Sequence, residues 1–198
     1  MKSTMKKVVL TICAALMGLS LSAQDVQVEV TAGANFSTYN MKVADGPVVQ
    51  YKGVGGFLGA IAEMPLSYGN GFYVNGGLLV SIKPMTANYE KQKSILFNPI
   101  SLEIPIHVGY KVYVAEDFAI FGEIGPYLGG ALSDLTGNYR GKDYNHFLFG
   151  AGFKLGLSYS RVKLYGGWDY NFINVIPKNA ISNYTRQHNG FIGVAFVF

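Results

Sequence analysis

The chain has little charge, a single cysteine and no long apolar segment beyond its first residues, and each shortage excludes a class of protein. Charged residues make up 14% of its 198 residues, which is low for the surface of a soluble domain. The one cysteine, Cys13, lies in a segment that we expect to be removed, so disulfides and cysteine-based metal sites are excluded. No stretch after Leu21 is apolar enough for a transmembrane helix. A helical membrane protein is therefore excluded as well.

The first residues have the order of a signal peptide. A lysine-rich start is followed by an apolar run from Val8 to Leu21 and by the small residues Ser22 and Ala23, which suit cleavage. We expect residues 1–23 to be a signal peptide and residues 24–198 to form one domain. The removed segment carries three lysines out of 16 basic residues, against 12 acidic residues, so the mature chain is nearly neutral. Its charge therefore indicates no nucleic-acid partner.

The remaining chain is rich in glycine and aromatic residues and contains eight segments with strand-like alternation. Each segment is long enough to cross a bilayer as a tilted strand. The combination predicts an all-β protein, an eight-stranded antiparallel up-and-down transmembrane β-barrel. The segments are 26–37, 53–64, 71–83, 101–113, 118–131, 146–158, 162–173 and 189–198.

The connections between these segments alternate in length. Short connections are typical of the periplasmic side of an outer-membrane barrel, and long ones of the extracellular side. We therefore expect a location in the Gram-negative outer membrane with both termini in the periplasm. The long, polar connections are 38–52, 84–100, 132–145 and 174–188, and the short ones are 65–70, 114–117 and 159–161.

Alternation along the fourth segment separates an apolar face from a polar one. Leu102 and Ile104 belong to the apolar face, and Glu103 and His107 to the other. An eight-stranded barrel is too narrow to enclose all its bulky apolar residues, so the apolar face must point to lipid. A lipocalin-like soluble barrel would need a polar face dense in lysine and glutamate, which is not present.

The second segment fits this pattern less well than the others. Phe57 and Ile61 share the parity of Glu63, so an apolar and a charged residue fall on the same face. A β-bulge or an error in the expected register would explain this.

The inward charges comprise four acids and four lysines, which predicts a network of ion pairs across the lumen. In such a network Glu123 would pair with a lysine such as Lys111. Glycines on the same face, Gly109 among them, would leave space for water, and serine should be tolerated at Gly109. A narrow water path stays open as an alternative. The predicted network, with one histidine, is Glu29, Lys83, Glu103, His107, Lys111, Glu123, Lys154, Lys163 and Asp169.

Outward aromatic residues fall at two heights, as in the interfacial girdles of outer-membrane barrels. The last strand-like segment ends on Phe198, which we expect to be the signal read by the barrel-assembly machinery. A buried final strand of a soluble sandwich is the alternative for this segment. The girdle residues are Phe36, Phe72, Tyr110, Phe118, Phe147, Phe149, Trp168, Tyr170, Phe172 and Phe196.

Three short strings and the terminal Phe198 resemble the PorT-like outer-membrane β-barrel family of the Bacteroidota. The strings are SLEIPI at 101–106, GPYLG at 125–129 and GAG at 150–152. The resemblance implies a small barrel of the OmpA/OmpX type. Since one member of that family is linked to type IX secretion, the resemblance also implies an alternative function as an accessory part of a secretion machine.

Catalytic, cofactor and metal residues are not expected. No histidine precedes a serine in the His-x-Ser order of lipid-A deacylases, and three scattered histidines are weak evidence for zinc. His146 with Asp143 or Asp169 is the one dyad that can be imagined, as part of a lipid-modifying enzyme.

Function is therefore expected in the long loops, as a structural or interaction role. Tyrosine, arginine and charges of both signs in 89–93, 139–144 and 183–186 suit contact with protein or glycan, and equally a solvated rim beside lipopolysaccharide. The expected partners are outer-membrane lipid and lipopolysaccharide, the assembly machinery and an extracellular or secretion-system protein. A minor narrow pore is a further alternative.

Overall fold

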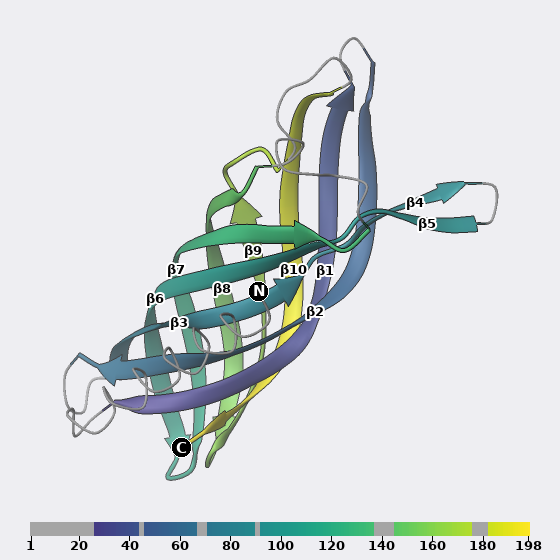
Figure 1. The fold of residues 1–198 in the computed structure, drawn as a ribbon. Helices are drawn as coiled ribbons and strands as arrows, with labels where there is room; N and C mark the ends of the chain where they lie inside the picture. The colour runs from purple at the N-terminus through teal and green to yellow at the C-terminus, as the bar shows by residue number, and fades with distance from the viewer. Residues whose placement is uncertain (1–25, 44–45, 67–70, 90–91, 137–144, 176–181) are drawn as a thin grey trace, which may run out of the picture.

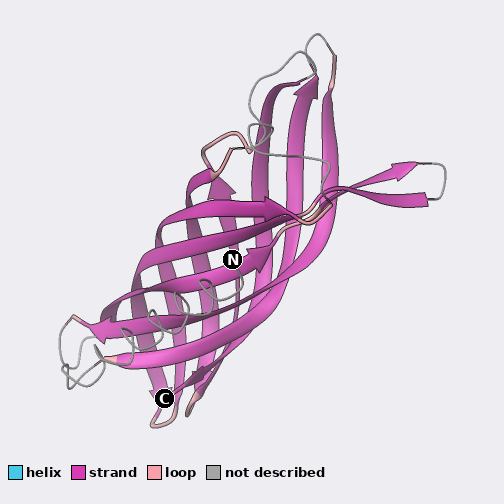
Figure 2. Ribbon diagram, in the orientation of Figure 1, coloured by secondary structure: helices cyan, strands magenta, loops and turns pink. Residues whose placement is uncertain are grey.

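The computed structural model describes residues 26–43, 46–66, 71–89, 92–136, 145–175 and 182–198. The described residues form ten strands joined by turns and short loops, and no helix (Figure 2). Accordingly, no helix in these ranges is long and apolar enough to span a membrane. The expected signal peptide, 1–23, lies outside the described residues.

Eight of the strands close into an antiparallel barrel, as the sequence predicts (Figure 1). β1 (Gln27–Val43) pairs with β2 (Val48–Pro65) on one side and with β10 (Ser182–Val197) on the other, which closes the ring. A closed barrel satisfies the backbone polar groups of every strand without water, as a bilayer requires. The remaining barrel strands are β3 (Phe72–Ile82), β6 (Pro99–Ala115), β7 (Phe118–Asp134), β8 (Phe147–Tyr159) and β9 (Val162–Asn171).

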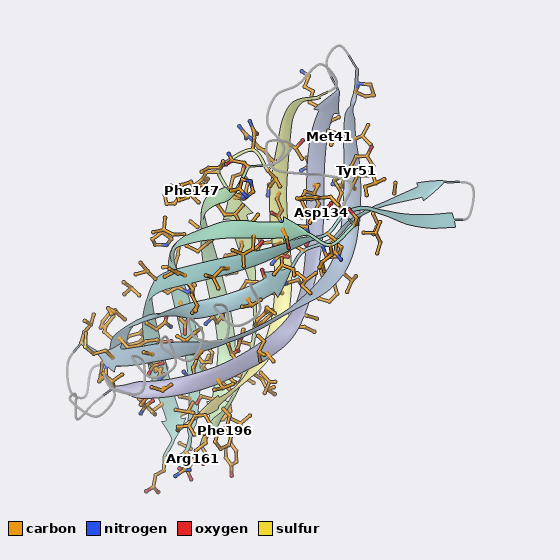
Figure 3. All side chains as sticks on the ribbon, in the orientation of Figure 1. Met41, Tyr51, Asp134, Phe147, Arg161 and Phe196 are labelled. Atoms are coloured by element: carbon orange, nitrogen blue, oxygen red, sulfur yellow. The ribbon has the colours of Figure 1, made fainter. Side chains whose placement is uncertain are left out.

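The barrel is apolar outside and polar inside because its strands alternate. On β6 the side chains of Ile104, Ile106 and Val108 are exposed, whereas Glu103 and His107 are buried in the lumen. Side chains stand outward along the whole wall, with Phe147 and Phe196 towards opposite ends (Figure 3). We call the end with the 116–117 and 160–161 turns, where the chain terminates, the turn end, and the opposite one the loop end.

At the loop end β1, β2 and β10 run further than the sequence predicts. Segment 38–52 was expected to be a loop, but Tyr39 pairs with Tyr51 and Asn40 with Gln50 in an unbroken ladder. Residues 38–43, 48–52 and 182–188 thus form a three-stranded sheet above the other strands, which we call the raised sheet (Figure 1). These residues lack apolar alternation because backbone pairing in water requires no lipid-facing surface.

Segment 84–100, also expected to be a loop, contains a hairpin of β4 (Met85–Tyr89) and β5 (Gln92–Phe97). β4 meets β2 at the pair Lys52 and Thr86, and the hairpin then points away from the barrel wall (Figure 1).

The suspected bulge in the second strand is absent. β2 keeps a continuous register with both β1 and β3, and Phe57, Ile61 and Glu63 all face the lumen. The outward face of β2 carries Val54, Leu58 and other uncharged residues. Some large apolar residues therefore point inward in this barrel, although the narrow interior of eight strands predicts that the apolar face points outward.

Candidate functional site

Six aromatic side chains point into the lumen, and each covers a glycine directly opposite it on the neighbouring strand. A Cβ atom at any of these glycines would collide with the facing ring. The aromatic rings fill the space beside these glycines, which was predicted to hold water, so that prediction is wrong. The pairs are Phe57 over Gly33, Tyr73 over Gly109, Phe121 over Gly156, Tyr127 over Gly150, Tyr165 over Gly193 and Phe191 over Gly167.

Each of the four lumen lysines lies over one of these rings and also bonds an acid. Both the face of the ring and the carboxylate stabilise the positive charge of the ammonium group. The ammonium-to-centroid distances are 5.6 Å for Lys83 and Tyr127, 4.7 Å for Lys111 and Tyr73, 4.8 Å for Lys154 and Tyr165, and 5.6 Å for Lys163 and Phe121.

Near the turn end Glu63 joins two lysines. Its Oε2 lies 2.9 Å from Lys163 Nζ, and its Oε1 accepts a hydrogen bond from Lys111. Lys163 also donates to Glu29. Glu63 is not among the residues predicted for the network, because the apolar Phe57 and Ile61 share its face. Among the described residues the lumen therefore holds five acids against four lysines, and the expected balance of four against four is wrong.

At mid-height in the lumen, the carboxylate of Glu123 lies near three hydrogen-bond donors or potential donors. Lys154 Nζ lies 2.7 Å from Oε2, Tyr73 donates to Oε1 at 2.9 Å, and His107 Nδ1 lies 3.5 Å from Oε2. The lysine that pairs with Glu123 is thus Lys154, whereas the suggested Lys111 bonds Glu63.

Nearer the loop end, Glu103 accepts from Lys83 at 2.6 Å and from Ser81 at 2.7 Å. Asp169 lines a lumen cavity of about 40 Å³ beside these residues. A cavity of this size holds a few water molecules at most. Of the nine residues predicted in the lumen, seven are buried and two, Lys111 and Asp169, are half-buried.

An apolar cluster covers the network at the loop end. It joins the base of the β4–β5 hairpin to the barrel wall, and the Tyr39 hydroxyl donates to the Lys83 carbonyl below it. With the filled lumen, this cluster leaves no room for a solute path among the described residues. Its buried members are Tyr39, Met85, Phe97, Ala131 and Val175.

Substitution at Gly109 tests how tightly the lumen is packed. The structure contradicts the expected tolerance, because a Cβ there collides with the ring of Tyr73, which is 2% exposed. Gly109→Ala is expected to lower the free energy of unfolding by about 1–3 kcal/mol, the usual cost of overpacking. Gly76→Ala on the outward face is the control, since its Cβ would meet nothing closer than 3.5 Å. Urea unfolding in detergent micelles measures both, and equal stability of the two variants would contradict the packing.

The predicted girdle residues all belong to the outward face. Eight of the ten are exposed, and Phe118 and Tyr170 are half-buried. Neighbouring rings contact each other at both ends, with centroids 4.6 Å apart for Phe72 and Tyr110 and 5.6 Å apart for Phe149 and Phe172. Phe198 is exposed and its ring lies 5.2 Å from that of Phe196.

Above its lowest residues, neither edge of the raised sheet pairs in a ladder with a further described strand, but the two edges differ in their backbone contacts. On the β10 side the Thr185 carbonyl accepts a 3.0 Å hydrogen bond from the Val175 N–H. On the other side Val48–Tyr51 of β2 pair only with β1 among the described residues, because β3 begins pairing at Gly56. We call residues 48–51 the β2 edge.

His146 and Asp169 do not form the imagined dyad. His146 is exposed at the loop end, where its Nδ1 lies 3.0 Å from the Ala131 carbonyl oxygen, whereas Asp169 faces the lumen. Asp143 lies outside the described residues, as do the loop residues 139–144. Within the described ranges no three His, Cys, Asp or Glu side chains are grouped to hold a metal ion.

Comparison with known proteins places the fold. Residues 22–177 match the family model described as outer membrane protein beta-barrel domain. No curated protein matches the chain. Neisserial surface protein A is similar in structure, with a TM-score of 0.52 and 17% identity over 86% of this chain and 97% of its own. OprG from Pseudomonas aeruginosa has a TM-score of 0.49 and 15% identity over 88% and 96% of the two chains.

Proposed function

The chain belongs to the outer membrane protein beta-barrel domain family, and we propose that it is a non-enzymatic barrel that binds another protein through its raised sheet. In this proposal the loop end is extracellular and both termini are periplasmic. The short turns at one end and the raised sheet at the other support that orientation. Phe198 would then meet the assembly machinery from the periplasm.

The observation that carries the proposal is the β2 edge. Unpaired backbone groups at the edge of a sheet can extend the ladder to a strand of another chain. The edge is part of a ladder that is continuous with the barrel, so its strand conformation is already fixed before a partner binds. A fixed edge loses little conformational entropy on binding.

The filled lumen supports a role outside it. The ion pairs, the aromatic rings and the apolar cluster together occupy the interior, and the 40 Å³ cavity is too small for a transported solute. The partner we propose is a protein with an extended segment. A subunit of a secretion machine, which the PorT-like resemblance raises, is one such partner.

Shortening the raised sheet tests this function. Replacing residues 41–49 by Asn-Gly removes Val48 and Val49, half of the β2 edge, and the pair Asn40 and Gln50 then closes a two-residue hairpin. The shortened barrel is expected to recover at least about tenfold less partner than the natural protein in a crosslinking pulldown from intact cells.

A matched control shortens the other projection of the barrel. Replacing residues 88–93 by Asn-Gly trims the β4–β5 hairpin at the pair Ala87 and Ser94 and keeps the β2 edge. This variant should recover partners at the natural level. Loss of partners in the control alone, or in neither variant, would show that the β2 edge is not the binding surface. A shift in gel mobility on boiling verifies that each variant has folded.

A further inference from the structure

The outward face of the raised sheet carries cations. Lys42, Lys52 and Arg186 are exposed there, on three neighbouring strands. The neutral residues between them are hydrogen-bonding groups such as Asn40, whose Oδ1 accepts from Gln50 at 3.2 Å. Among the described residues of these strand extensions, none is acidic. The described part of this face is therefore cationic and attracts anions.

These cations lie directly above the aromatic girdle. Phe36 opposes Val54 and Gly190 in the ladder, and two residues further along β1, Thr38 opposes Lys52. Two residues of a strand span about 7 Å. Girdle aromatics mark the boundary between hydrocarbon and headgroups, so Lys52 lies at the height of the headgroup phosphates.

A groove of about 640 Å³ extends from the level of the girdle residue Phe36 to the level of Lys52. It runs between the outer surface of β1 and β2 and the base of β4, close to where Tyr51 lies beside the hairpin (Figure 3). Phe36, Val54 and Ala87 contribute apolar lining, and Thr38, Lys52 and Thr86 contribute polar lining. A groove of this volume suits a small molecule or a headgroup.

We propose that this groove binds the phosphorylated sugar headgroup of lipid A in the outer leaflet. Lys52 Nζ pairs with a phosphate, the Thr38 hydroxyl bonds the sugar, and an acyl chain packs on Phe36 and Val54. The Thr86 hydroxyl donates its hydrogen to the Lys52 carbonyl, and its oxygen accepts a hydrogen bond from the sugar. A soluble anion would leave the apolar lining unused, and a plain hydrocarbon chain would leave the lysine and hydroxyls unused. The inference rests on the proposed orientation, and the groove shares Val49, Gln50 and Tyr51 with the β2 edge.

The test uses purified protein in detergent micelles and a fluorescent bis-phosphorylated lipid A, with binding followed by anisotropy. Lys52→Gln is expected to weaken binding about tenfold, the loss usual for one charged hydrogen bond. Arg161→Gln removes an exposed cation at the turn end and should change nothing. Removing the lipid phosphates should weaken binding to the natural protein equally, and should have little further effect on Lys52→Gln.

A second variant blocks the groove without removing charge. Thr86→Trp fills it and should abolish binding, while the boiling-dependent gel shift verifies the fold. The inference is overturned if Lys52→Gln binds like the natural protein, or if lipid A binds equally with and without its phosphates.

Failure of the orientation is detected separately by cysteine labelling. The one cysteine, Cys13, belongs to the expected signal peptide, so an impermeant maleimide should label Lys52→Cys, and not Glu116→Cys, in intact cells. Labelling of Glu116→Cys alone would refute the proposed function. Normal labelling with unchanged lipid binding in Lys52→Gln would refute the groove only.

Discussion

Val108→Arg is expected to lower the free energy of unfolding by about 1–3 kcal/mol, the cost of a charged residue on the lipid face of a barrel between the midplane and the interface. Val108 lies on the outward face of β6 with 51% of its surface exposed, between Val74 and Ile124 on the neighbouring strands. An arginine at this point cannot reach water without distorting the wall or the bilayer. Urea unfolding in lipid vesicles measures the effect.

The control places the same residue on the same strand at another depth. Val114, 62% exposed, lies two residues before the turn at 116–117. Since the cost of an arginine falls to about 0–1 kcal/mol near the interface, Val114→Arg should be nearly neutral. If both variants lost the same stability, the depth assigned to the two residues would be incorrect.

Glu123→Gln is expected to cost about 3–5 kcal/mol, because it leaves Lys154 buried without a counter-charge. Lys154 is 5% exposed and lies 2.7 Å from the lost carboxylate. Glutamine still offers an oxygen to Tyr73 and His107, so the loss reports on charge and not on hydrogen bonding alone. Folding free energies in micelles provide the measurement.

A double variant separates the ion pair from packing. Glu123→Gln with Lys154→Met removes both charges, and it should recover most of the lost stability, since a buried pair replaced by neutral groups is often close to neutral. A double variant less stable than Glu123→Gln would contradict this account. In planar bilayers the natural protein should show conductance near zero.

The barrel itself could be predicted from the sequence because lipid imposes a regular pattern on it. Every second residue in the membrane band must be apolar, and residues such as Ile104 and Val108 follow that rule without exception on β6. Strand number and which face points out both follow from this alternation and from the width of an eight-stranded barrel.

The raised sheet and the β4–β5 hairpin could not be predicted in the same way. Above the girdle both faces of a strand can be polar, so 38–43, 85–89 and 92–97 were predicted to be loops although their backbones pair. Whether two strands pair in water depends on neighbouring strands and turns. This dependence produces a weaker sequence pattern than the apolar alternation that lipid imposes.

The interior was the least predictable part. An inward glycine leaves a void or makes room for an aromatic ring, depending on the residue opposite it. Gly109 lies opposite Tyr73 because of the register between β3 and β6. Glu63 could have been found from the outward face instead. Val54, Leu58 and Met64 are all uncharged on the opposite parity, so Glu63 had to point inward.

The seam between β1 and β10 sets the order of folding. It joins residues as far apart as Glu29 and Val197, so the ring cannot close until the whole chain has been made. Contacts so distant in sequence are slow to form. Until they form, β1 and β10 both present unpaired backbone, which hydrocarbon does not tolerate. Insertion and closure of the barrel must therefore be a single late event, and a chain stalled before Ser182 should persist outside the bilayer as a target for chaperones and proteases.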